Sequence, residues 1–289
     1  MASRRPNEMW LLFRRIILAG SFLLAAALAA GWAYNNLRAA IPKADFLSAL
    51  DGSMERGHTW LASQERETTP GLQFMLADMR RARDDRDLTR LAHKFLAETP
   101  QPWGRVADSK WPFELPPAGY LERLPEYQRW HLYALAPGQV TLPEFERQRF
   151  FRQAAYTTGE LTHHTIGLLM HRQTNGPSPE VDAGIRADCE RIAREAALDF
   201  RVTDLYYQRI GVLLSAGYPD LVHPKWIERI ISNQGADGGW VVNWYGWDPS
   251  PQRFHFGESE TVSHSSIQAL WVLYLIRYRY PAWIDKHYR

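Results

Sequence analysis

The segment 226–276 constrains the fold more than any other part of this 289-residue chain. Apolar residues recur at helical spacing over 226–231, which predicts an amphipathic helix. The glycine-rich stretch 235–239 then ends that helix and permits a tight reversal, because glycine adopts positive φ at little cost. From Ile267 to Ile276 the chain is apolar almost all round, as in a helix buried between other helices. The segment therefore predicts an outer helix, a turn and a buried inner helix.

The turn carries the motif Gln234-Gly-Ala-Asp-Gly-Gly-Trp240. This motif resembles the Gln–Trp motif of the squalene/oxidosqualene cyclase and prenyltransferase superfamily, and a similar helix-plus-DGGW unit occurs in some polysaccharide lyases. The resemblance, which covers residues 226–276, implies an (α/α) toroid, in which outer helices surround inner ones. It implies a fold without naming a reaction. From the residues themselves, we expect the Gln234 amide to bond carbonyls at the helix end and Trp240 to cover the turn.

A repeat extends this pattern along the second half of the chain. Aligning Ile166, Ile210 and Ile267 superimposes three apolar helical segments that lie 44 and 57 residues apart. A two-helix solenoid unit is about 40–47 residues long. Outer helices are predicted at 179–200 and 224–234, with a last short helix at 281–287. The predicted fold class is all-α: an incomplete (α/α) toroid of helical hairpins with one N-terminal transmembrane helix.

The N-terminus carries a long apolar run. Residues 16–34 contain no charge and reach about 28 Å as a helix, which is enough to cross a bilayer core. Four arginines lie among residues 1–15, which predicts a cytoplasmic N-terminus, a span at 16–34 and a C-terminal domain outside the cytoplasmic membrane, in the periplasm. A cleavable signal peptide is the alternative, since small residues at 25–30 offer cleavage sites.

The next residues are less regular. Residues 35–70 are polar and mixed, so we interpret them as a stalk with one short helix near 43–50, and residues 71–289 as the toroid-like domain. Helices at 73–83 and 88–97 flank the cluster Arg83-Asp-Asp-Arg-Asp87, which fits neither DxDD nor DDxxD. We interpret this cluster as a solvated turn in which Asp87 caps the second helix.

The segment 99–143 is rich in proline and aromatic residues, so long helices are excluded except at 126–135. A long irregular segment inside a domain is typical of a functional lid. A strap packed across the outside of the barrel is the alternative interpretation.

In a toroid the N-terminal ends of the inner helices meet at one mouth, where free amides and partial positive charge favour anionic groups. The repeat alignment places Glu160 opposite Asp204, and His163 opposite Tyr207 and His264. The loop 241–259 adds aromatic side chains to this mouth. The predicted catalytic residues are His163, His264, Tyr207 and Asp204. The predicted ligand-binding residues are Glu160, His164, Trp244, Tyr245, Trp247, Phe254, His255, Phe256 and Glu258.

Histidine beside a carboxylate exchanges protons near neutral pH, which makes these residues candidates for catalysis. His264 resembles in position the zinc-binding histidine of prenyltransferase β subunits, and Asp204 matches the aspartate ligand of that family. The family's cysteine ligand has no counterpart, so zinc is a possible cofactor and not the favoured one. The alternative is that Asp204 caps its helix and the histidines satisfy buried polar groups.

Composition excludes several classes of protein. The net charge of +2, with acids among the bases, does not suggest nucleic-acid binding. The single cysteine, Cys189, excludes an internal disulfide and a cysteine-cluster metal site, and we assign it a packing role. The 12 Trp, 13 Tyr and 12 Phe favour a packed core or an aromatic cleft.

Three functions follow from this pattern. The first is a membrane-anchored module that binds a glycan or a lipid-linked chain in the aromatic and histidine-lined mouth, because aromatic faces stack on sugars and isoprenoids alike. The second is a lyase or hydrolase that acts on such a polymer through the predicted catalytic residues. The third is an envelope scaffold that docks a partner protein.

Overall fold

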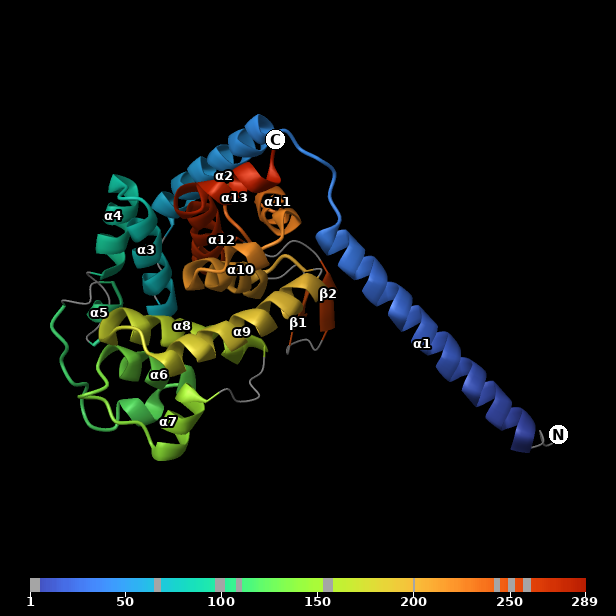
Figure 1. Cartoon of the computed structure of the whole chain (residues 1–289), viewed down its shortest axis with the longest axis horizontal. Helices are drawn as coiled ribbons and strands as arrows, with labels where there is room; N and C mark the ends of the chain where they lie inside the picture. Colours follow the sequence, from blue (N-terminus) through green and yellow to red (C-terminus); the bar gives the residue numbers. More distant parts are fainter. Residues whose placement is uncertain are drawn as a thin grey trace.

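The computed structural model describes residues 6–64, 69–96, 102–107, 111–152, 158–199, 201–241, 245–248, 253–256 and 261–289. The described chain is helical apart from one two-stranded hairpin, and a long first helix projects from the body that the others form (Figure 1). The α-helices are α1 (Pro6–Asn36), α2 (Lys43–Ser63), α3 (Pro70–Ala82), α4 (Arg86–Leu96), α5 (Gly104–Ala107), α6 (Glu126–Leu135), α7 (Glu144–Phe151), α8 (Thr158–Asn175), α9 (Pro179–Leu198), α10 (Asp204–Ala216), α11 (Pro224–Ser232), α12 (Ser263–Tyr274) and α13 (Pro281–His287). Short 3₁₀ turns η1 (Leu121–Arg123) and η2 (Pro219–Leu221), a π-helical turn η3 (Leu275–Arg279), and strands β1 (Tyr245–Asp248) and β2 (Arg253–Phe256) complete the order.

The inner helix predicted at the end of the chain is α12, and it lies in the middle of the body. It packs against α10, α3 and α2, and its residues from Ser265 to Ile276 are buried. The helices α8, α10 and α12 each contact the next, and the aligned Ile166, Ile210 and Ile267 are all fully buried. These helices therefore form the hydrophobic centre that the repeat predicted.

The side chains of the motif join the glycine turn to two helices, α2 and α11. The Gln234 amide donates to the carbonyls of Ser53 in α2 (2.9 Å) and Gly238 (2.8 Å). Trp240 is fully buried and its indole N–H donates to the carbonyl of Ile230 near the end of α11 (2.8 Å). Trp240 covers the turn, as expected. The carbonyl at the end of α11 accepts its hydrogen bond from the Trp240 indole, and not from the Gln234 amide as predicted.

Two features of the body differ from the sequence predictions, and a third agrees with one of the two interpretations offered for 99–143. Residues 43–63 form α2, whose buried face joins the core, so this part of the predicted stalk belongs to the folded domain. The cap of α4 is Asp85, which accepts from the backbone N–H groups of Asp87 (2.8 Å) and Leu88 (3.4 Å), so the prediction of Asp87 as the cap is wrong. Helix α6 lies along α8 with Trp130 buried, as expected of a strap.

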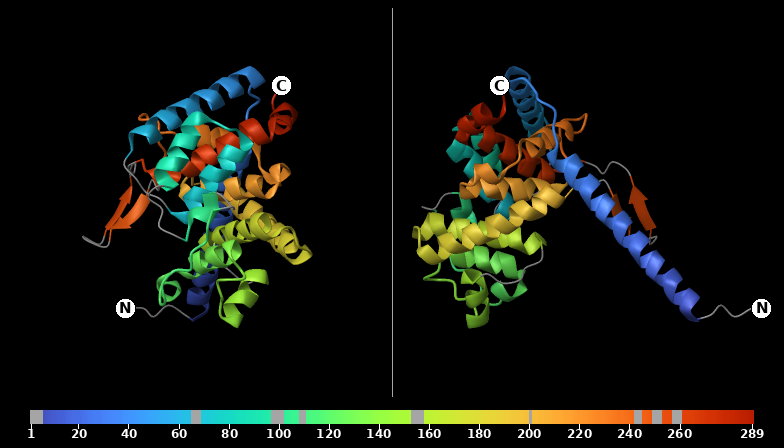
Figure 2. Two further views of the ribbon diagram at one scale, coloured as in Figure 1. Left: turned by 90° about the vertical axis from the view of Figure 1, so that its left-hand side faces the viewer. Right: turned by 45° about the vertical axis from the view of Figure 1, so that its right-hand side comes forward.

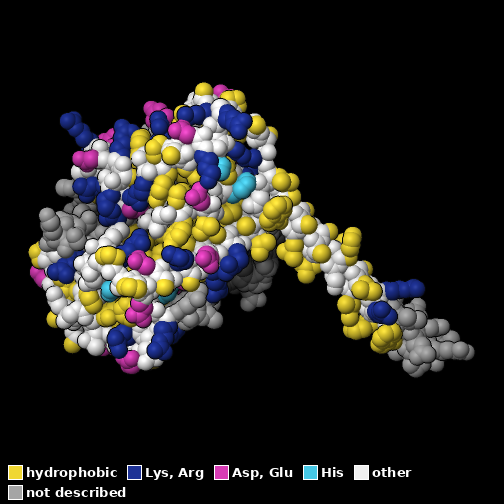
Figure 3. Space-filling model, in the orientation of Figure 1, with side chains coloured by type: hydrophobic (Ala, Val, Ile, Leu, Met, Phe, Trp, Pro, Cys, Tyr) yellow, Lys and Arg dark blue, Asp and Glu magenta, His cyan; other side chains and the backbone are white. Residues whose placement is uncertain are grey.

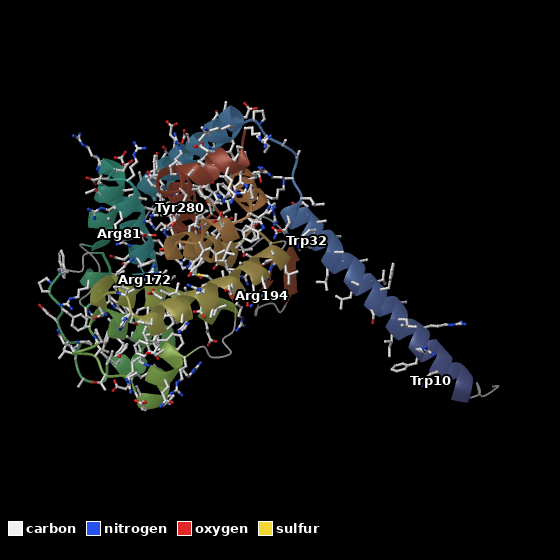
Figure 4. All side chains as sticks on the ribbon, viewed as in Figure 1. Trp10, Trp32, Arg81, Arg172, Arg194 and Tyr280 are labelled. Atoms are coloured by element: carbon white, nitrogen blue, oxygen red, sulfur yellow. The ribbon has the colours of Figure 1, made fainter. Side chains whose placement is uncertain are left out.

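The N-terminal helix α1 contains one stretch, Phe13–Asn36, that is long and apolar enough to cross a membrane, a property that a signal sequence shares. Hydrophobic side chains cover α1, whereas charged side chains of both signs are dispersed over the visible face of the body (Figure 3). Trp10 and Trp32 lie near the two ends of this helix (Figure 4).

Candidate functional site

A pocket of about 910 Å³ opens between α2, the turn that joins α3 to α4, and the C-terminal end of α12. Its lining brings together residues far apart in the sequence: His58 from α2, Asp85 from the turn, Tyr274 from α12, and Arg277 and Tyr278 from η3. We call this the α2/α12 pocket. Two features hold the lining residues in place. Helix α12 is buried in the body, and the Asp85 carboxylate is bonded to the backbone at the start of α4.

Three titratable side chains meet inside the α2/α12 pocket. The Tyr274 hydroxyl lies 2.5 Å from Nε2 of His58 and 3.4 Å from Oδ2 of Asp85. The other carboxylate oxygen of Asp85 caps α4, so the capping bonds hold this carboxylate in place. Tyr274 is buried, while His58 and Asp85 are half-buried and line the open part of the pocket. The arrangement is a hydroxyl placed between an imidazole and a carboxylate.

The surroundings push the pKa values of these three groups in different directions. Burial lowers the pKa of His58, and the charges of Asp85 and Asp87 only partly offset this. Burial and the nearby Asp85 carboxylate raise the pKa of Tyr274. Burial would raise the pKa of Asp85, but the bonds from the N–H groups of Asp87 and Leu88 outweigh it, and the pKa falls below its usual value. Near neutral pH the pocket therefore holds a neutral imidazole, a protonated phenol and an ionised carboxylate.

A π-helical turn shapes the mouth of the pocket. Directly after Tyr274 the helix widens into η3, a local irregularity that is common at functional sites. This turn presents Arg277 to Asp51 of α2, with N–O distances of 2.7 and 3.2 Å. It also presents Tyr278 to Arg83, whose guanidinium bonds the phenol oxygen and lies 4.5 Å from the ring centroid. These contacts tie α2 and the α3–α4 turn to the end of α12.

The predicted mouth lies elsewhere, at the N-terminal ends of α8, α10 and α12. His163 of α8 stacks on Tyr127 of α6 with ring centroids 4.3 Å apart. Burial and the charge of nearby His264 lower the pKa of His163 to about 4. His264 lies near the start of α12, with its Nε2 3.0 Å from the amide nitrogen of Gln268. The structure thus brings His163 and His264 together, about 15 Å along α12 from Tyr274 at 1.5 Å per residue.

Other predicted site residues have structural contacts. Tyr207 is fully buried, and its hydroxyl lies 3.1 Å from the Asn233 amide and 3.4 Å from the Val202 carbonyl. His164 is buried between Asp188 (2.7 Å) and the Phe150 carbonyl (2.9 Å). These two side chains face partners within the protein, as expected of buried polar groups that are satisfied.

Two further predicted site residues lie in the first turns of helices. Asp204 begins α10 and accepts from the backbone N–H of Leu205 (2.7 Å). Glu160 lies exposed in the first turn of α8. The two helices are joined next to these residues by a bond of 2.8 Å from Thr162 to Gln208.

The loop predicted to line the mouth contains the hairpin. Trp244 and Glu258 lie outside the described residues. The other five predicted residues of this loop belong to the paired strands: Tyr245, Trp247, Phe254, His255 and Phe256. Both views of Figure 2 show the hairpin extending outward from the helical body.

No group of three histidine, cysteine or acidic side chains is placed to hold a metal ion within the part of the chain that the structure describes. His163 and His264 are accordingly two nearby imidazoles without a third ligand among the described residues. The α2/α12 pocket, by contrast, holds a phenol, an imidazole and a carboxylate, which are groups that can exchange protons.

Sequence reasoning missed the α2/α12 pocket. Asp85 belongs to the acidic cluster, which was interpreted as a solvated turn. His58 belongs to a segment interpreted as a stalk, and Tyr274 ends a helix interpreted only as core. The sequence feature that could have revealed the pocket is the acidic cluster. A carboxylate that caps a helix with one oxygen keeps its other oxygen available for a second partner, as Asp85 does with Tyr274.

Comparison with known proteins finds no family model, no curated protein and no solved structure that matches the chain.

Proposed function

We propose that this protein is an acid–base enzyme, a lyase or hydrolase, that acts on a glycan in the α2/α12 pocket. The observation that carries the proposal is the Tyr274 hydroxyl placed 2.5 Å from His58 Nε2, in a pocket that also holds Asp85. Neighbouring groups whose surroundings drive their pKa values apart are the usual basis of an acid–base pair. His58 and Tyr274 have pKa values shifted in opposite directions.

The geometry supports a proton relay. The phenol oxygen of Tyr274 takes a proton from the substrate as its own proton moves to Nε2 of His58. The imidazolium formed in this way is stabilised by the Asp85 carboxylate, whose charge acts on His58. In elimination, the electron pair of the broken C–H bond forms the C=C bond of the unsaturated sugar as the adjacent C–O bond breaks, and the proton returns through Tyr274 to the departing oxygen. In hydrolysis, the proton comes instead from the water that attacks the anomeric carbon, and it returns in the same way to the departing oxygen. In both cases the three residues end in their starting state.

A glycan fits the lining of the pocket. The walls carry cationic Arg83, Arg90 and Arg277 together with acidic side chains such as Asp51 and Glu55, so neither sign of charge dominates. Such donors and acceptors suit the hydroxyl groups of a sugar, and a tyrosine ring supplies an apolar surface for its face. The volume of about 910 Å³ is within the range of small-molecule sites.

The test compares two pocket tyrosines. Purified full-length protein is assayed on a panel of polysaccharides for new reducing ends and for unsaturated sugar ends, which separate hydrolysis from elimination. Tyr274→Phe is expected to lower kcat by about 10²–10⁴-fold, the usual contribution of general acid–base catalysis. Tyr278→Phe is the matched control, because its hydroxyl contacts Arg83 and not His58, and it should retain activity within a few-fold.

Equal loss of activity in both variants would contradict the relay. A second candidate, the glycan-binding module, is favoured by the same mixed polar and aromatic lining. It requires that a polysaccharide binds without being cleaved, and that Tyr274→Phe and Tyr278→Phe weaken binding to a similar extent.

We also propose that the helices form an incomplete (α/α) toroid. In support, α3, α8, α10 and α12 make a closed series of contacts, and α9 packs outside α8 and α10. For α1, a retained membrane anchor with the domain outside the cytoplasm is supported by Arg4, Arg5, Arg14 and Arg15 before the span. Protease digestion of intact spheroplasts should release the domain and leave an N-terminal tag protected.

A further inference from the structure

The outer face of α9 carries a row of alternating charges. Asp182, Arg186, Glu190 and Arg194 follow one another at intervals of four residues, so acid and base alternate along one side of the helix. Arg186, Glu190 and Arg194 are exposed, and the side chain of Asp182 is 47% exposed. On the face of the molecule seen in Figure 3, acidic and basic side chains alternate over α9. We call these four residues the α9 charge row.

Most of this row has no partner of opposite charge. Asp182 lies 3.5 Å from Arg172 of α8, in a pair that is open to solvent. Arg186, Glu190 and Arg194 make no ion pair with any of the residues that the structure describes. The α9 charge row therefore has three charges available to a partner outside the chain.

The order of the signs in the α9 charge row is self-complementary. A second α9 that lies antiparallel to the first, with a two-fold axis level with position 188, sets Asp182 opposite the second copy's Arg194. The same axis sets Arg186 opposite the second copy's Glu190. Each pairing occurs twice because the axis relates the two copies. Residues four apart form the ridges along which helices pack, so one row can lie along the other.

Two hollows along the same face leave room for a second helix. One hollow of about 500 Å³ lies over the first half of α9, and its lining includes Ala183 and Ala187. Another, also of about 500 Å³, lies over Ala193 and Ala197, between α9, the end of α1 and the start of α11. In the antiparallel register, the first hollow of one copy faces the second hollow of the other. Small side chains at these positions let two helix axes approach closely.

The direction of α1 agrees with this symmetry. The buried Asn35 amide donates to the carbonyls of Ala196 (2.7 Å) and Ala197 (3.1 Å), which fixes the end of α1 to the end of α9. The two-fold axis of the pair lies in the plane of the contact face and crosses the direction of α9. Figure 1 looks onto that face, and α1 extends across the direction of α9 in this view and not toward the viewer, as Figure 2 also shows. The symmetry therefore leaves the two α1 helices pointing the same way, as one bilayer requires.

We propose that α9 is the interface of a homodimer, in which two copies of this chain pair antiparallel through their α9 charge rows. Charge complementarity selects a second copy as the occupant of this face, because the face complements itself in a single antiparallel register. The α2/α12 pocket takes no lining residue from α9, so the interface and the pocket are separate surfaces. The dimer does not depend on the reaction proposed for that pocket.

The test is disulfide cross-linking of the purified full chain, reconstituted into vesicles of phosphatidylcholine and phosphatidylglycerol and oxidised with copper phenanthroline. Position 187 lies next to the axis, so Ala187→Cys in the two copies is offset by about 3 Å along the helices, within reach of a disulfide. Ala183→Cys is the matched control on the same face, because its two copies are offset by about 15 Å. The wild-type chain supplies the background, since Cys189 is buried and burial raises the pKa of its thiol.

Ala187→Cys is expected to give several-fold more of a species of twice the mass than Ala183→Cys. Equal yields overturn the proposal, because they indicate random collision, and so does the absence of cross-linking at 187. Flotation of the wild-type chain with the vesicles tests the anchor separately. Cross-linking at 187 without flotation keeps the dimer and removes the anchor, whereas flotation without cross-linking removes the dimer.

Charge reversal tests whether the α9 charge row sets the register. Arg186→Glu, added to Ala187→Cys, places two acids opposite each other and is expected to lower the cross-linked fraction several-fold. Adding Glu190→Arg restores opposite charges and should return the fraction to the level of Ala187→Cys alone. An unchanged fraction in the single reversal, or a double reversal that stays as low as the single one, overturns the proposal. Circular dichroism of each variant checks that the helical content is unchanged.

Discussion

Replacement of Gln234 by alanine tests the role of the glycine turn in joining helices. The Gln234 amide donates to the carbonyls of Ser53 and Gly238, and its oxygen accepts from the Ser53 hydroxyl (2.9 Å) and from Arg56 (2.6 Å). Gln234→Ala removes all four bonds at once. It leaves a half-buried carbonyl of α2 and a carbonyl of the turn without their donors.

The expected loss of stability follows from the exposure of these bonds. The two amide bonds are partly buried and contribute about 1 kcal/mol each, and the Ser53 hydroxyl bond contributes somewhat less. The Arg56 bond is exposed to solvent and adds little. We therefore expect Gln234→Ala to lower the free energy of unfolding by about 2–3 kcal/mol, which corresponds to a fall in Tm of roughly 4–12 °C for a domain of this size.

The measurement is thermal and urea unfolding of the detergent-solubilised full chain by circular dichroism. Gln148→Ala on α7 is the matched control, because this exposed glutamine bonds only its neighbour Glu144, and its loss should cost less than about 0.5 kcal/mol. If the two variants unfold at the same temperature, the turn does not hold α2 to the rest of the domain.

Two further predictions concern packing and pH. A Cβ atom at Gly57 would lie 2.7 Å from the Trp240 ring and 2.9 Å from Leu270, so Gly57→Ala should lower the free energy of unfolding in urea by about 1–3 kcal/mol. Gly52→Ala on the same helix is the control. Its Cβ atom would have its nearest neighbour at 3.5 Å, so this substitution should be neutral or stabilising by up to about 1 kcal/mol. The pKa of His163 is lowered to about 4 by burial and His264, so the unfolded chain binds this proton more readily than the folded one. The stability that the neutral His163 contributes should be fully present above pH 6.5 and should be lost as the pH drops toward 4. Unfolding measured as a function of pH should show a smaller loss of unfolding free energy between pH 6.5 and 5 in His163→Phe than in the wild type.

The sequence predicted the helical framework because that framework is local. The turns that follow α8 and α10 carry glycine and proline, and the apolar segments around Ile166, Ile210 and Ile267 recur at the spacing of a helical hairpin. All three isoleucines are fully buried, as the alignment required. Patterns of this kind depend on a few neighbouring residues, and tertiary contacts only reinforce them.

The α2/α12 pocket escaped prediction because its residues come together only through tertiary contacts. His58 and Tyr274 are 216 positions apart, and no spacing in the chain connects them. The pairing depends on α2 packing against α12, and α2 has a mixed composition with only a weak apolar face. Gly57 permits that packing, since Trp240 and Leu270 lie where its side chain would be.

The residues between α1 and α2, which were predicted to belong to a stalk, are fastened to the folded body. Between α1 and α2, Arg38 bonds Glu228 (3.0 Å) and lies 4.6 Å from the centroid of the Tyr288 ring, and the backbone N–H of Lys43 donates to the carbonyl of Arg289 (2.8 Å). The C-terminal residues therefore fasten the connection that would otherwise act as a hinge. Since α2 also supplies His58, the pocket is held in one orientation relative to α1. For the proposed glycan substrate, this means that the polymer must diffuse or bend to reach the pocket, because the described residues between α1 and α2 are fastened to the body and form no hinge.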